Sequence, residues 1–175
     1  MIIGIAGPAG AGKDTVADFL VSHYNFTKLA FAGPLKEMLA AGGFPEPVRE
    51  LKEAKIEGFD FTWRQAAQQL GTEFGRALDP DIWTKIIDRR IDVLAEQRKR
   101  VVISDVRFEN EAVLIRKRGG YIIHMVNRRS DLGGAGGHAS EAGVRSGPGD
   151  ASMCNDGTIE DLYRNLKTHM YVRSR

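Results

Sequence analysis

The residues of this sequence best suited to chemistry lie in one glycine-rich stretch near its amino end. Residues 2–15 read IIGIAGPAGAGKDT, an apolar run followed by glycines at positions 7, 10 and 12 and then by Lys13. Glycine lets the backbone turn tightly and aim its N–H groups at one point. A helix that begins near Lys13 would add the partial positive charge of its amino end, and the lysine could reach the outer phosphates. The stretch therefore predicts a phosphate-binding loop for a nucleoside triphosphate.

One position departs from the common pattern of such loops, in which a hydroxyl residue follows the lysine. Here the carboxylate of Asp14 takes that place, and the hydroxyl comes next as Thr15. A carboxylate can hold magnesium directly or through water, and Thr15 would then contact an inner phosphate. The structural alternative for Asp14 is a role at the start of the helix. Because strand, glycines, lysine and helix stand in register, we favour phosphate binding.

A second group of polar residues follows the strand predicted at 101–103. Side chains just past the carboxyl ends of parallel strands converge on the ligand crevice. Asp105 is therefore expected near the phosphate loop, where it would support magnesium or orient an acceptor group; its alternative is a helix cap. Arg107 could clamp a phosphate with two hydrogen bonds, or could pair with Asp105 or Glu109.

Two further basic clusters are candidates for phosphate recognition. Arg64 and Gln68 are four residues apart on a predicted helix, so they share a face that could contact a phosphate and a base edge, or simply solvent. Arg128 and Arg129 precede a glycine-rich segment, residues 130–150, that is expected to be mobile. Closure of such a segment over phosphates would exclude water and offset developing charge, although two adjacent arginines alone more often form a solvated pair.

The apolar pattern predicts the scaffold that would position these residues. Strands are expected in the opening apolar run and at 26–32, 101–103, 121–126 and 151–154. Helices are expected at 15–23, 35–41, 63–74, 82–97, 109–118 and 159–170, with a short helical piece near 48–55. Thr62 and Thr158 stand where helix caps are needed. Strands that alternate with helices imply a mostly parallel sheet covered on both faces.

Bulk properties narrow the class of protein. The chain has 175 residues, 42% of them hydrophobic and 27% charged, which is typical of a single soluble domain. A net charge of +2 makes no case for nucleic acid or membrane as a partner. The single Cys154 excludes a disulfide within the chain, and the short opening run is typical of a core strand rather than a signal peptide, so we expect a cytoplasmic protein. The apolar face with Ile86, Ile87 and Leu94 fits either core or a homodimer contact.

Several motifs together resemble the deoxynucleoside monophosphate kinases encoded by tailed bacteriophages. They are GPAGAGKDT, WRQAAQQLGTEFGR followed by DPDIW, VVISDVRFENEA, and HASE before NDGTIEDL. The resemblance spans nearly the whole chain, with all segments in the expected order. It implies an α/β fold: a single P-loop kinase domain over residues 1–175, with three α/β/α layers and a mostly parallel five-stranded sheet. An acceptor-binding helical region would cover about 34–80, and a lid-like segment about 128–148.

The resemblance also implies a reaction and a set of site residues. The γ-phosphoryl group of ATP would move to a deoxynucleoside 5′-monophosphate with the help of Mg²⁺, in the host cytoplasm if the protein is phage-encoded. ATP would be held by Gly10, Ala11, Gly12, Lys13, Asp14 and Thr15, with Asn155 and Gly157 beside the adenine. The acceptor site would be lined by Lys36, Trp63, Arg64, Gln68, Arg76, Arg107, Glu111, His138 and Glu141. Mg²⁺ would be bound by Asp14, Thr15 and Asp105. The catalytic residues would be Lys13, Asp105, Arg107, Arg128 and Arg129.

Two rival functions fit part of the same pattern. One is another small-acceptor kinase, acting on dephospho-coenzyme A, shikimate or phosphomevalonate. The other is a nucleotide-responsive binding module that hydrolyses ATP slowly to switch a partner. The binding module would expose an apolar patch, for which the sequence shows no obvious segment, although Phe44, Phe59 and Phe61 stand in less regular stretches.

Overall fold

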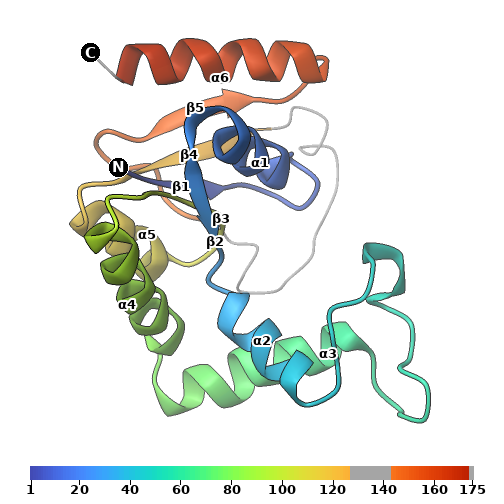
Figure 1. Ribbon diagram of the computed structural model, residues 1–175. Coiled ribbons are helices and arrows are strands. Elements are labelled where there is room, and N and C mark those ends of the chain that lie inside the picture. The colour runs from blue at the N-terminus through green and yellow to red at the C-terminus, as the bar shows by residue number, and fades with distance from the viewer. Residues whose placement is uncertain (127–142, 174–175) are drawn as a thin grey trace. The chain divides into compact units, whose positions relative to one another are not determined.

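Five parallel strands organise the structure, a computed structural model that describes residues 1–126 and 143–173 (Figure 1). The strands are β1 (Ile2–Ala6), β2 (Phe26–Leu29), β3 (Arg100–Val106), β4 (Tyr121–Val126) and β5 (Ala151–Cys154). Their order in the sheet is β2-β3-β1-β4-β5, and every neighbouring pair is parallel. The carboxyl ends of the strands therefore meet at one edge, which is where β1 runs into the glycine-rich loop.

The chain forms two compact units. The first, called here the sheet unit, comprises Met1–Ala30 and Ile91–Arg175 and contains all five strands. The second, the helical unit, comprises Phe31–Arg90. The expected single domain over residues 1–175 stays a prediction.

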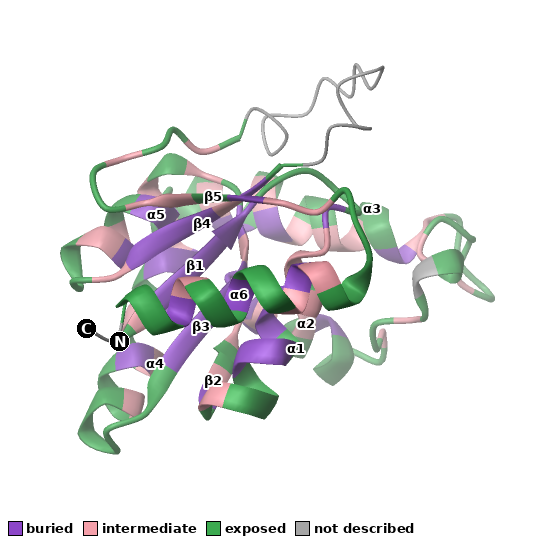
Figure 2. Ribbon diagram, turned by 90° about the horizontal axis from the view of Figure 1, so that it is seen from above, coloured by how far each residue is buried: buried purple, intermediate pink, exposed green. Residues whose placement is uncertain are grey.

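Helices cover both faces of the sheet within the sheet unit. Ile3 and Ile5 of β1 belong to the core cluster that packs under α1 (Lys13–Tyr24) and α6 (Ile159–Arg173). Gly4 between them faces α5 (Glu109–Lys117), because a Cβ atom there would lie only 2.6 Å from Cδ1 of Ile115. Figure 2 shows the buried strands enclosed by helices whose outer sides are exposed. The predicted three-layer α/β/α architecture with a parallel five-stranded sheet is confirmed.

A buried carboxylate joins three elements of this unit. Asp150 precedes β5, and its side chain is fully buried. It accepts hydrogen bonds from the Arg116 guanidinium of α5 at 2.6 Å and from the backbone N–H groups of Gly147 and Ile122 at 2.7 and 2.9 Å. A nitrogen of His124 on β4 lies 3.2 Å away. Because these groups favour the charged form more than burial opposes it, the pKa of Asp150 lies well below its ordinary value.

The helical unit is built around two tryptophans. It contains α2 (Gly33–Ala41), the 3₁₀ turn η1 (Arg49–Leu51), α3 (Trp63–Gln68), the π-helix η2 (Gln69–Arg76) and most of α4 (Ile82–Glu96). Trp63 and Trp83 form its core with Leu35 and Leu39. Thr62 caps α3: its hydroxyl accepts from the Gln65 N–H at 3.1 Å, and its own N–H donates to Gln65 Oε1 at 2.8 Å.

Some element boundaries differ from the prediction. β2 ends at Leu29, because residues 30–32 lead into α2 instead of continuing to pair with β3. β3 continues to Val106, since Ala6 of β1 still pairs with that residue, and so Asp105 lies inside the strand. The helix expected over 63–74 is an α-helix only to Gln68 and then widens into η2. The helical piece expected near 48–55 is only the short turn η1.

The structure also bears on two further expectations, one about membranes and one about a homodimer contact. Among the helices that the structure describes, none has the length and apolar character needed to cross a membrane. Ile86 packs against the core of the helical unit, which accounts for part of the apolar face of α4 without a partner chain. The homodimer contact stays a prediction.

Candidate active site

The loop between β1 and α1 needs its glycines. Gly7, Gly10 and Gly12 have φ angles of 142°, 78° and 89°, which only glycine adopts readily. Space is restricted at two of them: a Cβ atom would lie 2.7 Å from the Met125 carbonyl at Gly7 and 2.5 Å from Asn155 Nδ2 at Gly12. At Gly10 a Cβ atom would meet nothing, so only the backbone angle requires glycine there.

The amino end of α1 faces this loop without a side-chain cap. Gly12 is the residue before the helix and has no side chain with which to cap it, while its carbonyl accepts the Val16 N–H at 3.0 Å. The first N–H groups of a helix have no acceptor within the helix, and they carry a partial positive charge. An uncapped helix start beside a glycine-rich loop is a site suited to phosphate.

Lys13, the first residue of α1, folds back over the loop. Its ammonium group donates to the carbonyls of Gly7 and Pro8, both at 2.8 Å. Burial lowers the pKa of Lys13, the nearby positive charge of Arg107 lowers it further, and the carboxylates of Asp14 and Asp105 oppose this. The structure thus places Asp105 and Arg107, from the end of β3, within electrostatic range of the loop lysine.

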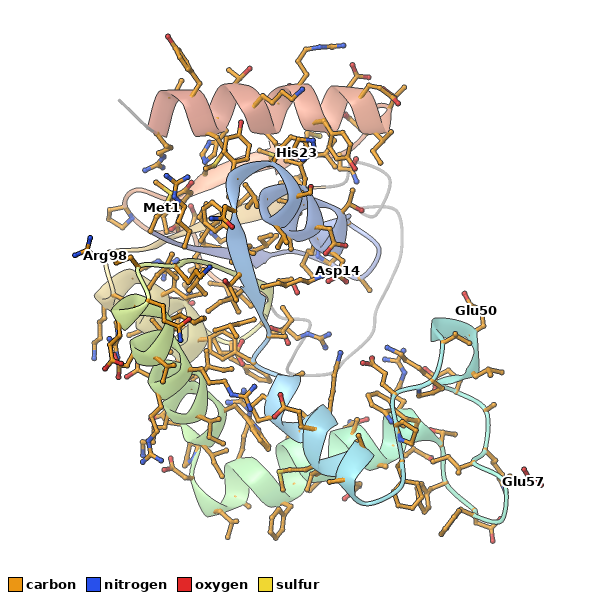
Figure 3. The ribbon with its side chains drawn as sticks, in the orientation of Figure 1. Met1, Asp14, His23, Glu50, Glu57 and Arg98 are labelled. Carbon is orange, nitrogen blue, oxygen red and sulfur yellow. The ribbon has the colours of Figure 1, made fainter. Side chains whose placement is uncertain are left out.

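Asp14 is engaged by a lysine that the sequence analysis did not single out. Nζ of Lys28 on β2 lies 2.9 Å from Oδ1 of Asp14 and 2.9 Å from Oδ1 of Asp18. Asp14 itself is 78% exposed, and Figure 3 labels it on the ribbon. Burial alone would lower the pKa of Lys28, but its hydrogen bonds to Asp18 and Asp14 raise it overall. The available signal was a lysine in the otherwise apolar strand sequence FTKLAFA.

Asn155 ties the end of β5 to the phosphate loop. Its side-chain Nδ2 donates to the Ala11 carbonyl at 3.1 Å, and its backbone N–H donates to the Val126 carbonyl at 3.1 Å. Gly157, two residues on, stands against the start of α6, where a Cβ atom would come within 2.9 Å of the Asp161 carboxylate. The structure therefore brings Asn155 to the predicted loop, whereas Gly157 borders the helix cap.

Glu111 supports the backbone that carries Arg107. It is only 2% exposed, and its Oε2 accepts the N–H groups of Arg107 and Phe108 at 2.8 and 3.0 Å. Glutamate at this position of a helix satisfies donors that the helix leaves unpaired. Glu111 was predicted as an acceptor-site residue, and the structure gives its carboxylate a structural contact beside Arg107.

The helical unit contains a second charged cluster. Glu46 bridges two lysines: it pairs with Lys36 at 2.9 Å and also with Lys52. The Lys52 ammonium lies 5.3 Å from the ring centroid of Trp63, whose indole N–H donates to the Phe44 carbonyl at 3.1 Å. These contacts bring Lys36 and Trp63 to one patch; Glu46 and Lys52 had not been predicted for the site.

The remaining predicted site residues do not all lie beside the Lys36 and Trp63 patch. Arg64 is the neighbour of Trp63 and pairs with Glu53, and Gln68 is exposed at the end of α3. Arg76 donates to the Pro80 carbonyl at 3.1 Å, in the turn before α4 rather than in the lysine cluster. Arg128, Arg129, His138 and Glu141 lie outside the described residues.

The loop region offers carboxylates for a magnesium ion but no complete cage. Within residues 1–126 and 143–173, no group of three or more His, Cys, Asp or Glu could hold a metal ion. Magnesium in nucleotide enzymes keeps several waters and uses one or two carboxylates together with substrate phosphates. Asp14 beside the loop and Asp105 on β3 fit such a shared site, whereas a metal bound by protein alone does not fit.

Comparisons with known proteins agree on one family. The family model described as deoxynucleotide monophosphate kinase matches residues 46–166. A protein of Acanthamoeba polyphaga mimivirus, named provisionally as a deoxynucleotide monophosphate kinase, is 32% identical over 183 residues, covering 95% of this chain and 94% of the relative. The deoxynucleotide monophosphate kinase of Enterobacteria phage T4 is 24% identical over 242 residues, covering 98% and 99%.

A solved structure supports the fold alone. The crystal structure of a sugar kinase from Janibacter superposes with a TM-score of 0.50 at 15% identity, covering 95% of this chain and 91% of that one. At this identity the likeness carries over the α/β/α architecture and no substrate.

Proposed function

The chain belongs to the deoxynucleotide monophosphate kinase family, and from this we propose that it transfers the γ-phosphoryl group of ATP to a deoxynucleoside 5′-monophosphate. It is a kinase whose product is the deoxynucleoside diphosphate. The observation that carries the proposal is the loop between β1 and α1, where Lys13 holds the carbonyls of Gly7 and Pro8 beside an uncapped helix start.

We propose that this loop holds the triphosphate of ATP. Backbone N–H groups of Gly10, Ala11 and Gly12 and of the first turn of α1 would donate to phosphate oxygens. The Lys13 ammonium would leave the Gly7 and Pro8 carbonyls and donate to the outer phosphates instead. Asn155, directly after β5, supports the arrangement because its side chain donates to the Ala11 carbonyl.

Asp14, Thr15 and Asp105 are the residues that would hold Mg²⁺ together with the phosphates. When bound, the ion supplies positive charge that neutralises the phosphate oxygens. For Asp14 this means sharing its carboxylate between the ion and Lys28, which now holds it. Because its pKa is raised, Lys28 stays positively charged at neutral pH. Its ion pair can therefore orient the Asp14 carboxylate.

The acceptor nucleotide would be held by cationic and polar residues. Arg107 can offer two parallel N–H donors to its phosphate, on a backbone that Glu111 fixes. In the helical unit, Lys36 and Arg64 would supply positive charge, and the buried Trp63 would support the segment that carries Arg64. Gln68 would read the base edge. Arg76, Arg128, Arg129, His138 and Glu141 remain predicted members of the site.

Phosphoryl transfer of this kind needs little covalent help from the protein. Two anionic substrates must be brought in line while their repulsion is cancelled, and positioning and charge stabilisation supply most of the rate. The pKa of Lys13 is lowered first by burial and then by repulsion from the positive charge of Arg107. Anionic phosphates bound near both would relieve that repulsion, so the free site is already arranged for negative charge.

The test is a phosphoryl-transfer screen. The purified chain is incubated with ATP, Mg²⁺ and each ribo- or deoxyribonucleoside monophosphate in turn, and nucleoside diphosphates are separated and quantified. We expect diphosphate formation with at least one deoxynucleotide and little ADP without an acceptor. The proposal would be overturned if ADP formed at the same rate with and without every acceptor. Transfer only to dephospho-coenzyme A, shikimate or phosphomevalonate would overturn it as well.

A further inference from the structure

A cavity of about 480 Å³ lies in the sheet unit, far from the phosphate loop. It is lined by residues 21–25, which join α1 to β2, and by residues 98–100, which join α4 to β3. It thus sits at the amino ends of the strands, whereas the phosphate loop sits at the carboxyl ends. Figure 3 shows the separation, with Arg98 and Asp14 labelled at opposite ends of the sheet.

The cavity is strongly basic. Arg98, Lys99 and Arg100 all line it, and none of its lining residues is acidic. In the part of the chain that the structure describes, these three side chains form no ion pair with a carboxylate. Arg100 makes a long contact of 3.5 Å to the Tyr24 carbonyl at the end of α1, and its guanidinium lies 6.0 Å from the ring centroid of Phe26. Unpaired cations gathered around a cavity attract an anion.

The backbone at the cavity takes the left-handed conformation at two residues, of which Asn25 adopts it readily and Arg98 does not. In the described ranges, Asn25 and Arg98 are the non-glycine residues with positive φ, at 55° and 56°, and both line this cavity. Arg98 follows the end of α4, where helices usually place a glycine because a side chain disfavours this conformation. An arginine kept at such a position points to a role for its guanidinium rather than for its backbone.

A second cavity, of about 290 Å³, adjoins the first. The two share Tyr24 and Arg100, and the second adds Met1, Met170 and Tyr171. Aromatic rings are the surfaces on which nucleobases stack, and methionine side chains adapt to flat apolar groups. The first cavity is thus cationic and its neighbour is partly aromatic, and the first is in the size range of small-ligand sites, roughly 300–1,000 Å³.

We propose that these two neighbouring cavities form a second nucleotide site, which binds a nucleoside phosphate away from the phosphate loop. Arg98, Lys99 and Arg100 contact the phosphate groups, and Tyr24 and Tyr171 contact the base. The proposal rests on these residues alone and does not depend on the phosphoryl-transfer reaction proposed above.

The test follows ADP binding residue by residue. The ¹⁵N-labelled full chain is titrated with ADP, and in separate arms with adenosine and with inorganic phosphate, while backbone amide signals are recorded by NMR. We expect saturable shifts at residues 23–25 and 98–100 with ADP, and at least tenfold weaker binding of adenosine or phosphate. Shifts at residues 7–15 report the phosphate loop independently, so failure of one site is distinguishable from failure of the other.

Variants sharpen the result. The double change Arg98→Gly with Lys99→Ala should weaken ADP binding at the cavity at least tenfold, while shifts at 7–15 persist. The matched control, Lys117→Ala with Lys167→Ala, removes two exposed lysines elsewhere and should leave both sets of shifts intact. Arg98→Gly alone should raise the melting temperature, because glycine relieves the positive φ.

Three outcomes would overturn the proposal. Cavity amides that do not move with ADP, or that move equally in the double variant, would exclude the site. Inorganic phosphate that binds as tightly as ADP would reduce it to a simple anion site. A lower melting temperature for Arg98→Gly would show that the arginine is retained for stability.

Discussion

At the scale of single residues, Lys13 is the centre of the account. Its ammonium group rests on two loop carbonyls at 2.8 Å, and burial lowers its pKa. Both acceptors are backbone carbonyls of the loop itself. A bound phosphate would therefore have to compete with them for the Lys13 ammonium group. The group that would bind the nucleotide is therefore the one that contacts the loop carbonyls.

We predict that Lys13→Ala lowers kcat/KM for phosphoryl transfer by about 10²–10³-fold, the range seen when one preorganised charge-stabilising donor is lost. The fold should persist, because the lysine contributes only two hydrogen bonds, to loop carbonyls. Steady-state kinetics and a thermal melt check both parts. Lys117→Ala, an exposed lysine on α5, is the control and should leave the rate unchanged.

Asn155 is predicted to act on ATP binding more than on the chemical step. Asn155→Ala removes the 3.1 Å bond to the Ala11 carbonyl, and a hydrogen bond of this kind is worth about 0.5–1.5 kcal/mol. We expect the KM for ATP to rise by roughly two- to tenfold, with kcat changed much less. Asn165→Ala, on the exposed side of α6, is the matched control. A fall in kcat with an unchanged KM would contradict this role.

The residues that sequence analysis missed share a physical cause. Glycines, Lys13 and Asp14 could be predicted because their spacing along the chain is itself the signal. Lys28, Glu46 and Lys52 act through partners that are brought near by folding, and charged residues in surface segments are too common to mark such pairs. Glu111 was expected at the site, but only the structure reveals that its carboxylate holds the Arg107 backbone.

At the scale of elements, two helix caps provide a matched pair. Thr62 caps α3 in the helical unit, and Thr158 caps α6 in the sheet unit, where Asp161 N–H donates to its hydroxyl at 3.2 Å. Each change to alanine should cost about 1 kcal/mol of unfolding free energy, measured by urea denaturation.

The two caps should differ in activity. Thr62→Ala loosens the start of α3, which carries Trp63 and Arg64, so the KM for the acceptor should rise several-fold. Thr158→Ala should leave that KM unchanged. Equal effects of both variants on the acceptor would contradict the placement of the acceptor site in the helical unit.

Element types were largely predictable, whereas some boundaries were not. Continuous apolar runs such as YIIHMV mark strands that are buried on both faces, and the structure has that strand at Tyr121–Val126 as expected. The end of β2 and the extension of β3 depend on which neighbour continues to pair, which one strand's sequence does not contain. The widening into η2 occurs where Gly71 and Gly75 let Leu35 and Trp83 approach, with the Trp83 indole donating to the Gly71 carbonyl at 2.8 Å.

At the scale of the whole molecule, Asp150 should govern acid stability. Its pKa is lower in the folded chain than in the unfolded chain, so the unfolded state binds more protons as pH falls. The stabilisation is therefore fully present above the unfolded pKa, about 3.9, and is lost as the pH falls below it toward the folded value.

We predict that Asp150→Ala lowers the unfolding free energy at pH 7 by about 3–5 kcal/mol, because Arg116, which also pairs with Glu109, loses its buried carboxylate partner and the N–H groups of Ile122 and Gly147 lose their acceptor. The gap between variant and wild type should narrow below about pH 4. Urea denaturation across pH provides the measurement. Asp60→Ala, a fully exposed partner of Lys55, should stay within about 0.5 kcal/mol of wild type. A gap that stays constant down to pH 2 would contradict the linkage.

The most direct test of the central claim is a crystal structure with a non-hydrolysable ATP analogue and a deoxynucleoside monophosphate. The account predicts β- and γ-phosphate oxygens within hydrogen-bond distance of the N–H groups at 10–13, with the Lys13 ammonium on phosphate and no longer on the Gly7 and Pro8 carbonyls. A triphosphate bound elsewhere, with Lys13 still on those carbonyls, would contradict it.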